Sequence, residues 1–264
     1  MVKTDNFFVI SNYNVDPHNL TMYANSYLVY DQSDNPEVIA RNQGKQDSRI
    51  ISHPNTGHNH IVFFKYILDN YDNLPARVAF LKGNIIGRHV TQEFWDRNYD
   101  NSFYTFLWQD SEFRDKPGIA YSLGSGQFIE RNNNWFVARS THRYFTELNQ
   151  LISFFYESSI FAEYNLFAPG GCYIVERERI LRNPKSFYSG LIKIMDYTFF
   201  PSEVWMVERL MHFFFTTDKP LKSYVYDEAK LAQKIDEIKD KSNWMPRRSI
   251  KDRLLKHPNQ VLFH

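Results

Sequence analysis

Residues 7–14 (FFVISNYN) and 27–34 (YLVYDQSD) are two short apolar runs, and each ends in small polar or acidic residues. A buried parallel strand has this pattern when its carboxyl end opens onto a ligand crevice. Residues 20–26 between the runs have room for a short helix, so we expect a strand, a helix and a second strand. This order predicts the nucleotide-binding start of an α/β fold.

The next part of the chain continues in the same order. Residues 38–40 and 49–52 are expected as minor strands. Residues 53–59 (HPNTGHN) form a loop rich in breakers, and from His60 onward apolar residues recur at helical spacing. Residues 77–83 (RVAFLKG) then have the composition of another buried strand. Loop, helix and strand therefore alternate, as they do in α/β sheets.

The second half is less regular. Residues 84–134 break into short aromatic pieces, which we expect to be substrate-facing loops, and a turn leads into a strand at residues 173–175. Helical patterns cover residues 144–161, 177–181, 187–195, 201–215 and 227–241. We therefore expect a Rossmann-like α/β fold with a mixed, mostly parallel sheet flanked by helices. One elaborated domain would span residues 1–224, followed by a helical, basic extension over residues 225–264.

Composition narrows the classes of partner and compartment. The 264 residues carry 31 Lys and Arg against 30 Asp and Glu, so no overall field attracts nucleic acid or an acidic membrane. No stretch approaches the ~18 apolar residues of a membrane span, and the N-terminus lacks a signal-peptide pattern. Cys172 is the only cysteine, which excludes an internal disulfide. We expect a cytoplasmic protein without a membrane span.

Two positions in the first half are candidates for nucleotide binding. Asp31 follows the second strand, where a carboxylate can accept hydrogen bonds from a ribose or base; Asp34 competes for this role, and a turn-capping aspartate is the alternative. Gly57 precedes a helix, whose free N–H groups and dipole favour a diphosphate. The alternative is an ordinary N-cap at Asn55 or Thr56.

Phosphate charge must be neutralised by a metal or by basic side chains. The strand at residues 77–83 is followed by no Asp-x-Asp, and the nearest substitute for Mn or Mg is Asp110 with Glu112. Lys82, Arg88 or the basic pair at residues 247–248 could neutralise a diphosphate instead. Whether Mn or Mg binds stays open.

Glu208 is the first candidate for general base. It lies on an aromatic-rich helix, where partial desolvation raises the pKa of a carboxylate toward that of a useful base. A surface charge or a buried ion pair is the alternative. Glu203, the second catalytic candidate, sits near the helix start and could instead complement the helix dipole. The histidines show no metal-ligand spacing, and Cys172 is expected to pack structurally.

Four blocks taken together resemble a family of GT-A-type glycosyltransferases. This family occurs in bacterial surface-glycan loci and large DNA viruses, and the chain is similar to chlorovirus capsid-glycan transferases. The blocks are VISNYN at 9–14, HPNTGHN at 53–59 with YDNLP at 71–75 and FLKG at 80–83, APGGCYIV at 168–175, and VERL at 207–210. The resemblance covers residues 7–215 in order and rests on the succession of the blocks.

The resemblance implies that a UDP- or GDP-linked sugar binds at the strand ends of the N-terminal half. The second half, with Gly170 and Gly171, would bind a glycan acceptor of a surface or capsid polysaccharide or glycoprotein. Glu208 would be the base of an inverting transfer. The positions implied to contact the donor are Tyr13, Asn14, Asp31, Asn55, Gly57, His58 and Asn59. The chain departs from the pattern in lacking Asp-x-Asp, so metal dependence and activity stay open.

Two other functions compete with a transferase. A non-catalytic carbohydrate-binding or scaffold protein could keep the same fold without turnover. A phosphoester hydrolase could use Asp110, Glu112 and histidines. The sequence leaves the oligomeric state open.

Overall fold

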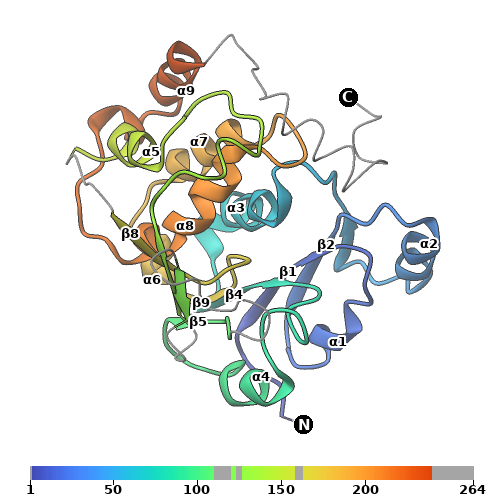
Figure 1. The fold of residues 1–264 in the computed structure, drawn as a ribbon. Helices are drawn as coiled ribbons and strands as arrows, with labels where there is room; N and C mark the ends of the chain where they lie inside the picture. The colour runs from blue at the N-terminus through green and yellow to red at the C-terminus, as the bar shows by residue number, and fades with distance from the viewer. Residues whose placement is uncertain (1, 110–119, 123–126, 158–162, 240–264) are drawn as a thin grey trace.

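A mixed sheet forms the centre of the structure, with strand order β3-β2-β1-β4-β9-β5 (Figure 1). The computed structural model describes residues 2–109, 120–122, 127–157 and 163–239. The strands of this sheet are β1 (Phe7–Asn12), β2 (Tyr27–Asp31), β3 (Ile50–Ser52), β4 (Arg77–Lys82), β5 (Thr105–Phe106) and β9 (Tyr173–Glu176). Strands β1 to β4 pair in parallel, whereas β9 is antiparallel to β4 and to β5. The predicted mixed, mostly parallel sheet is confirmed.

Helices connect and cover these strands. They are α1 (His18–Thr21), α2 (Pro36–Gly44), α3 (His58–Asn70), α4 (Gln92–Asn98), α5 (Leu148–Phe155), α6 (Arg177–Ile180), α7 (Lys185–Met195), α8 (Ser202–Thr216) and α9 (Glu228–Ile238), with 3-10 turns η1 (Tyr71–Asn73) and η2 (Ser223–Tyr226). None of the helices in the described ranges is long and apolar enough to cross a bilayer.

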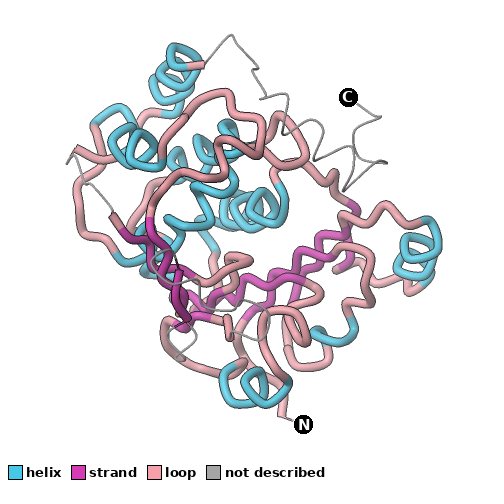
Figure 2. The backbone as a smooth tube through the Cα atoms, in the orientation of Figure 1, coloured by secondary structure: helices cyan, strands magenta, loops and turns pink. Residues whose placement is uncertain are grey.

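The sheet is buried on both faces, so each face has its own hydrophobic core. In β1, Val9 packs in one cluster, whereas Phe8 and Ile10 pack in the other. In β4, Phe80 joins the first cluster and Ala79 the second. Successive residues of a strand point to opposite faces, which produces this alternation. Helices α3, α7 and α8 cover the first face, and α1 and α4 cover the second; Figure 2 shows the strands between these two groups of helices.

Three antiparallel strands form a smaller sheet in the order β6-β7-β8. They are β6 (Ala120–Ser122), β7 (Phe128–Arg131) and β8 (Tyr164–Phe167). Helix α8 packs on β8, so this sheet joins the first face of the larger one. Strand β8 then leads directly through residues 168–172 into β9, and this short connection bears on the site described below.

Several local expectations need correction. Residues 38–40 are not a strand but lie inside α2, because Asn35 accepts a hydrogen bond from the Glu37 backbone N–H and Pro36 suits a first helical turn. Residues 84–134 are not loops throughout: Thr91 caps α4, and β5, β6 and β7 follow. The helix expected over residues 144–161 is shorter, Leu148–Phe155, and the first short helix is His18–Thr21 rather than residues 20–26.

The predicted helix over residues 227–241 forms as α9, and it packs on the body of the fold. Leu231 and Ile235 are fully buried, and α9 contacts α7. A Cβ atom added to Gly190 of α7 would lie 2.8 Å from Leu231 Cδ2, so the two helices approach closely at this point. The basic residues 247–248 lie outside the described residues.

The connection order of the large sheet places a ligand position between β1 and β4. The chain passes from β1 to β2 and β3 on one side, and helix α3 then carries it back to β4 on the other side of β1. In open α/β sheets, ligands bind outside the carboxyl ends of the strands at such a reversal. Residues that follow β1 and β4, together with the start of α3, therefore define the candidate site.

Candidate functional site

Residues 168–172, between β8 and β9, bring two glycines to this position. Strand β9 is antiparallel to β4 and pairs Tyr173 with Phe80, so the residues before Tyr173 lie at the carboxyl end of β4. Gly170 and Gly171 have φ angles of 88° and 65°. Because these angles are costly for residues with a side chain, the sequence Gly-Gly permits the turn.

The backbone of Gly170 joins two helices. Its N–H donates to Glu208 Oε1 on α8 at 2.6 Å, and its carbonyl accepts from Asn59 Nδ2 on α3 at 2.8 Å. Helix α3 comes from the N-terminal half and α8 from the C-terminal half. The turn therefore fixes Asn59 and Glu208 against the carboxyl end of β4.

Two basic side chains lie over the Cα atom of Gly170. A Cβ atom placed on this glycine would be 3.1 Å from His89 Nε2 and 3.3 Å from Lys82 Cδ. Lys82 ends β4, and His89 lies in the turn that follows it. We call Lys82, His89, Gly170 and Glu208, with Asn59, the Gly170 cluster.

A buried ionic network with Arg209 and Glu130 holds the side chain of Glu208. Glu208 is 8 % exposed, and its Oε2 accepts from Arg209 Nη1 at 3.2 Å. Arg209 Nε donates to Glu130 Oε2 at 2.5 Å, and Trp135 Nε1 donates to Glu130 Oε1 at 3.1 Å. Burial raises the pKa of Glu208 although Arg209 opposes this rise. Both sequence interpretations of Glu208 thus meet here: the side chain is desolvated and belongs to a buried ion pair.

Three histidines around the cluster are held neutral. Burial, reinforced by the charge of Lys82, lowers the pKa of His58 and of His89 to about 3. Burial also lowers the pKa of His60 well below its usual value. The Nδ1 atom of His58 lies 2.6 Å from Asn59 Oδ1, whereas both ring nitrogens of His60 and of His89 lack a hydrogen-bond partner among the described residues. Neutral imidazoles beside a lysine are suited to recognising an anion without repelling it.

Helix α3 starts with two residues in the left-handed region. Gly57 and His58 both have φ near 57°. A Cβ atom on Gly57 would lie 2.1 Å from Ile61 Cγ1, so glycine is required there. Asn55 and Thr56 do not cap the helix, because Gly57 is the N-cap residue and the Thr56 hydroxyl donates to Asp196. A positive φ is energetically costly for a residue other than glycine, and such residues are found often at functional sites. His58 has this conformation.

The predicted nucleoside contacts lie on the same edge, at the ends of β1 and β2. Asp31 Oδ1 accepts from Asn12 Nδ2 at 3.1 Å and from Ser33 Oγ at 2.5 Å, and Asp31 Oδ2 accepts from Asn42 Nδ2 at 2.9 Å. We call these four residues the Asp31 cluster. Asp31 is 8 % exposed. Its hydrogen bonds join the ends of β1 and β2 to α2.

The remaining donor candidates surround the Asp31 cluster. Tyr13 and Asn14 donate from their side chains to Asp34 at 2.7 Å each. Asn55 Oδ1 lies 3.5 Å from Gln32 Nε2, and the backbone N–H of His53 donates to the Asp31 carbonyl. The candidates therefore lie in two groups along one edge. The first group is at the Asp31 cluster. The second group is at the Gly170 cluster and contains His58, Asn59, Lys82 and Glu208.

Glu203 is not brought to the Gly170 cluster. It is fully buried, and its Oε1 accepts from the backbone N–H groups of Arg143 and Tyr144 at 2.9 and 2.8 Å. Its Oε2 accepts from the Tyr197 hydroxyl at 2.7 Å. Burial raises the pKa of Glu203, and these donors partly offset the rise. This carboxylate anchors the chain before α5.

The described residues do not provide a metal-ligand set. No three His, Cys, Asp or Glu side chains within the described ranges lie close enough to hold an ion. The candidates Asp110 and Glu112 lie outside the described residues. The Cys172 thiol is fully buried, and burial raises its pKa to about 12, so the thiol stays protonated. Lys82 and Arg88 are the positive charges that help to lower the pKa of His58 and of His89.

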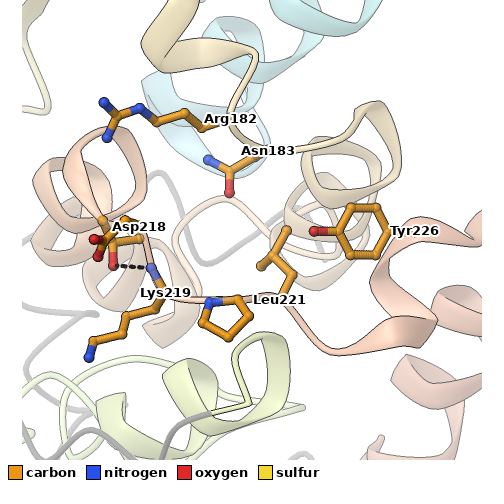
Figure 3. Close-up of a pocket in the computed structure, with 8 residues that line it drawn as sticks. Arg182, Asn183, Asp218, Lys219, Leu221 and Tyr226 are labelled. Atoms are coloured by element: carbon orange, nitrogen blue, oxygen red, sulfur yellow. Dashed lines mark hydrogen bonds between the residues drawn. The ribbon is translucent and has the colours of Figure 1, made fainter.

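A cavity of about 320 Å³ opens elsewhere (Figure 3). Its lining residues are Arg182, Asn183, Thr217, Asp218, Lys219, Pro220, Leu221 and Tyr226. Strand β9 runs from Tyr173 to Glu176, which pairs with Arg77 at the start of β4, and residues 182 and 183 follow. The cavity is therefore on the side of the amino ends of the parallel strands, away from the Gly170 cluster. None of the predicted site residues lines it.

Sequence reasoning missed four residues of this site: His60, His89, Glu130 and Arg209. The sequence patterns led us to consider the histidines only for metal spacing and for a phosphoester hydrolase, and His60 and His89 stand far from Gly170 in the chain. The signal that could have found His89 is its place just after a buried strand, where ligand-binding side chains gather.

Comparisons with protein-family models, with curated proteins and with solved structures found no match for this chain.

Proposed function

We propose that this protein is a glycosyltransferase with a GT-A-like fold, which moves a sugar from a UDP- or GDP-linked donor to a hydroxyl of a surface or capsid glycan. One observation carries the proposal: Lys82 and Glu208 both lie beside Gly170, at the reversal point of the sheet. A cation for the leaving diphosphate and a carboxylate for the acceptor proton are the two groups that such a transfer needs.

The proposed reaction inverts the anomeric centre. The acceptor oxygen forms a bond to the anomeric carbon while the bond from that carbon to the diphosphate oxygen breaks. The electron pair of the broken bond stays on the diphosphate, whose charge Lys82 stabilises. Glu208 accepts the acceptor proton, and its raised pKa makes it a stronger base than an exposed carboxylate.

The donor would lie along the edge from the Asp31 cluster to the Gly170 cluster. Tyr13, Asn14 and Asp34 form a polar group at the nucleoside end. The start of α3 follows β3 on the side of the carboxyl ends of the strands, and from His58 onward its first N–H groups would be offered to phosphate; the Gly57 N–H donates to the Thr198 carbonyl. Asp31 supports the strand ends through its internal hydrogen bonds.

The proposal assigns no step to a metal ion. The described residues do not fit Mn or Mg, which prefer several oxygen ligands. Lys82 and Arg88 supply the positive charge in the proposed mechanism. Addition of Mn or Mg to the assay below checks this assignment, because equal rates with a chelator are expected.

The test measures the release of nucleoside diphosphate from a panel of UDP- and GDP-linked sugars with glycan acceptors. We expect turnover with one donor and a loss of at least ~10²-fold in Glu208→Gln, because the general base is removed. Glu203→Gln is the matched control on the same helix and should keep its rate. If no nucleoside diphosphate raises the melting temperature, with or without Mn, and no donor is consumed, the proposal is wrong.

A non-catalytic carbohydrate-binding or scaffold protein is the second candidate. It is favoured by the fact that both carboxylate oxygens of Glu208 already accept hydrogen bonds, from Gly170 and Arg209. Such a protein would bind nucleoside diphosphate or glycan without turnover. Equal donor consumption by the native protein and Glu208→Gln, at the level of a blank, would favour it.

A further inference from the structure

His89 is a buried side chain without a structural task among the described residues. Its backbone is fixed in the turn after β4, since its N–H donates to the Ile85 carbonyl and its carbonyl accepts from the Gln109 N–H. The side chain is 7 % exposed, and neither ring nitrogen meets a partner in the described ranges. A buried polar group without a partner lowers stability, so a histidine at this position needs another reason.

The ring of His89 and the side chain of Lys82 approach the same point above Gly170. The Nε2 atom of His89 and Lys82 Cδ lie 3.1 and 3.3 Å from this point. The Lys82 ammonium is two bonds beyond Cδ, and no ion pair to it is found in the part of the chain that the structure describes. Gly170 cannot move away, because Asn59 and Glu208 hold its backbone. One donor and one cation therefore converge over a fixed glycine.

The charges around His89 select the kind of ligand. Burial and the neighbouring Lys82 and Arg88 hold the pKa of His89 at about 3, so the ring is neutral. A neutral ring can donate one hydrogen bond from Nε2 while both neighbours remain positive. A cationic ligand would be repelled by Lys82 and Arg88. Oxygen atoms that carry negative charge and accept hydrogen bonds match this set, and those of phosphoryl groups do so especially well.

We propose that His89 and Lys82 together bind the diphosphate of the donor, with His89 Nε2–H donating to a phosphoryl oxygen and Lys82 supplying the charge. The identity of the diphosphate as part of a nucleotide sugar rests on the proposed function. The binding of a diphosphate does not, because it can be measured without a sugar or an acceptor. His89 is thus a binding residue that no sequence motif marks.

The experiment titrates the full chain with inorganic pyrophosphate by calorimetry, with sodium sulfate as the control for nonspecific anion effects. The variants are His89→Phe, His89→Gln and Lys82→Met. The matched controls are His18→Phe, an exposed histidine of α1, and Lys65→Met, a lysine of α3 that pairs with Asp69. Melting temperatures are measured for every variant, because a purely structural histidine would affect stability and not binding.

We expect His89→Phe to weaken pyrophosphate binding by about tenfold, which is ~1.4 kcal/mol, without lowering the melting temperature. His89→Gln keeps a donor and should recover most of the affinity. Lys82→Met should weaken binding by more than His89→Phe, because the charge is lost. The two controls should bind pyrophosphate as the native protein does.

Three results would overturn the inference. The native protein does not bind pyrophosphate better than sulfate, or His89→Phe binds it equally well, or His89→Phe loses binding only together with a lowered melting temperature that His89→Gln shares. These outcomes leave the glycosyltransferase assay untouched, since that assay scores donor consumption. Conversely, pyrophosphate binding that depends on His89 stands even if no sugar donor is consumed.

Discussion

The Asp31 cluster and the Gly170 cluster lie on the same edge of one sheet, but Asp31 and His89 differ in their hydrogen-bond partners. In the Asp31 cluster, both carboxylate oxygens of Asp31 accept hydrogen bonds from side chains of Asn12, Ser33 and Asn42. The amide oxygens of Asn12 and Asn42 have no partner among the described residues. In the Gly170 cluster, both nitrogens of His89 lack a partner among the described residues. Burial is similar, since Asp31 is 8 % and His89 7 % exposed. Exposure alone therefore does not distinguish them.

The difference separates a side chain that serves folding, Asp31, from one that we propose to bind a ligand, His89. A buried polar group that is fully hydrogen-bonded contributes to stability, whereas one without a partner reduces it. The carboxylate of Asp31 is thus satisfied within the fold, although the amide oxygens of Asn12 and Asn42 are not. At the end of β4, backbone hydrogen bonds fix Lys82 and Gly83, and those of Gly170 to Glu208 and Asn59 fix the turn beside them, but the ring of His89 stays without a partner among the described residues. Substitutions in the two regions should therefore affect different measurements.

The largest expected effect concerns the support behind Glu208. Arg209→Met leaves Glu130 and Glu208 buried without their shared cation, so we expect a loss of about 3–5 kcal/mol in the free energy of unfolding. Urea denaturation measures it. Arg139→Met is the matched control, because Arg139 also stacks on Trp135 but is exposed. A loss below ~1 kcal/mol for Arg209→Met would show that the network does not support the cluster.

Lys82→Met tests the side chain that we propose to bind the donor diphosphate. If donor turnover is found, we expect its rate to fall by about 10²–10³-fold, as when a group that stabilises developing charge is removed. Stability should not fall, because burial already lowers the pKa of Lys82 and so disfavours its charge. Donor assays with Lys65→Met as control decide the matter. A rate within about threefold of the native rate would remove Lys82 from the proposed mechanism.

Asp31→Ala tests the carboxylate that is satisfied within the fold, and its readout is stability rather than turnover. The change leaves the amides of Asn12 and Asn42 without their acceptor, so we expect a loss of about 2–3 kcal/mol in the free energy of unfolding. Asp34→Ala removes an exposed carboxylate from the same loop and should cost less than ~1 kcal/mol. Equal losses in the two variants would contradict a structural role for Asp31 and favour one in binding.

The strand ends could be predicted from the sequence because short apolar runs between breakers are local signals. The run at residues 7–14 and the strand before Gly83 were found in this way. Residues 38–40 were misinterpreted because three apolar residues resemble a strand, although Asn35 and Pro36 already formed a helix start. Local patterns fail where capping and apolar content point to different structures.

The Gly170 cluster could be predicted only in part, because its members come from distant parts of the chain. Glu208 and Lys82 were selected for their chemistry, yet nothing in the sequence shows that both reach Gly170. His89 carries no motif, and its role depends on an antiparallel strand that returns the chain to β4. Long-range strand pairing is set by the whole fold, so it leaves no local pattern around His89.

The smallest expected effect concerns His60, which lies beneath Gly171 with neither ring nitrogen paired in the described residues. Its pKa is lowered by burial in the folded protein, so the unfolded protein binds the extra proton below about pH 6.5. Acidification below about pH 6.5 therefore favours the unfolded state and lowers the free energy of unfolding.

His60→Phe should flatten the loss of stability between about pH 6 and pH 5 by up to ~1.4 kcal/mol per pH unit, since one proton is no longer taken up on unfolding. Urea denaturation of both proteins at several pH values measures this slope. Glu203 and Glu208, whose pKa values are raised, act in the opposite direction in both proteins and cancel in the difference. His18→Phe, at an exposed position, is the control. Parallel curves for His60→Phe and the native protein would mean that His60 takes up its proton in the folded protein as it does in the unfolded one, which would contradict a neutral His60 at this site.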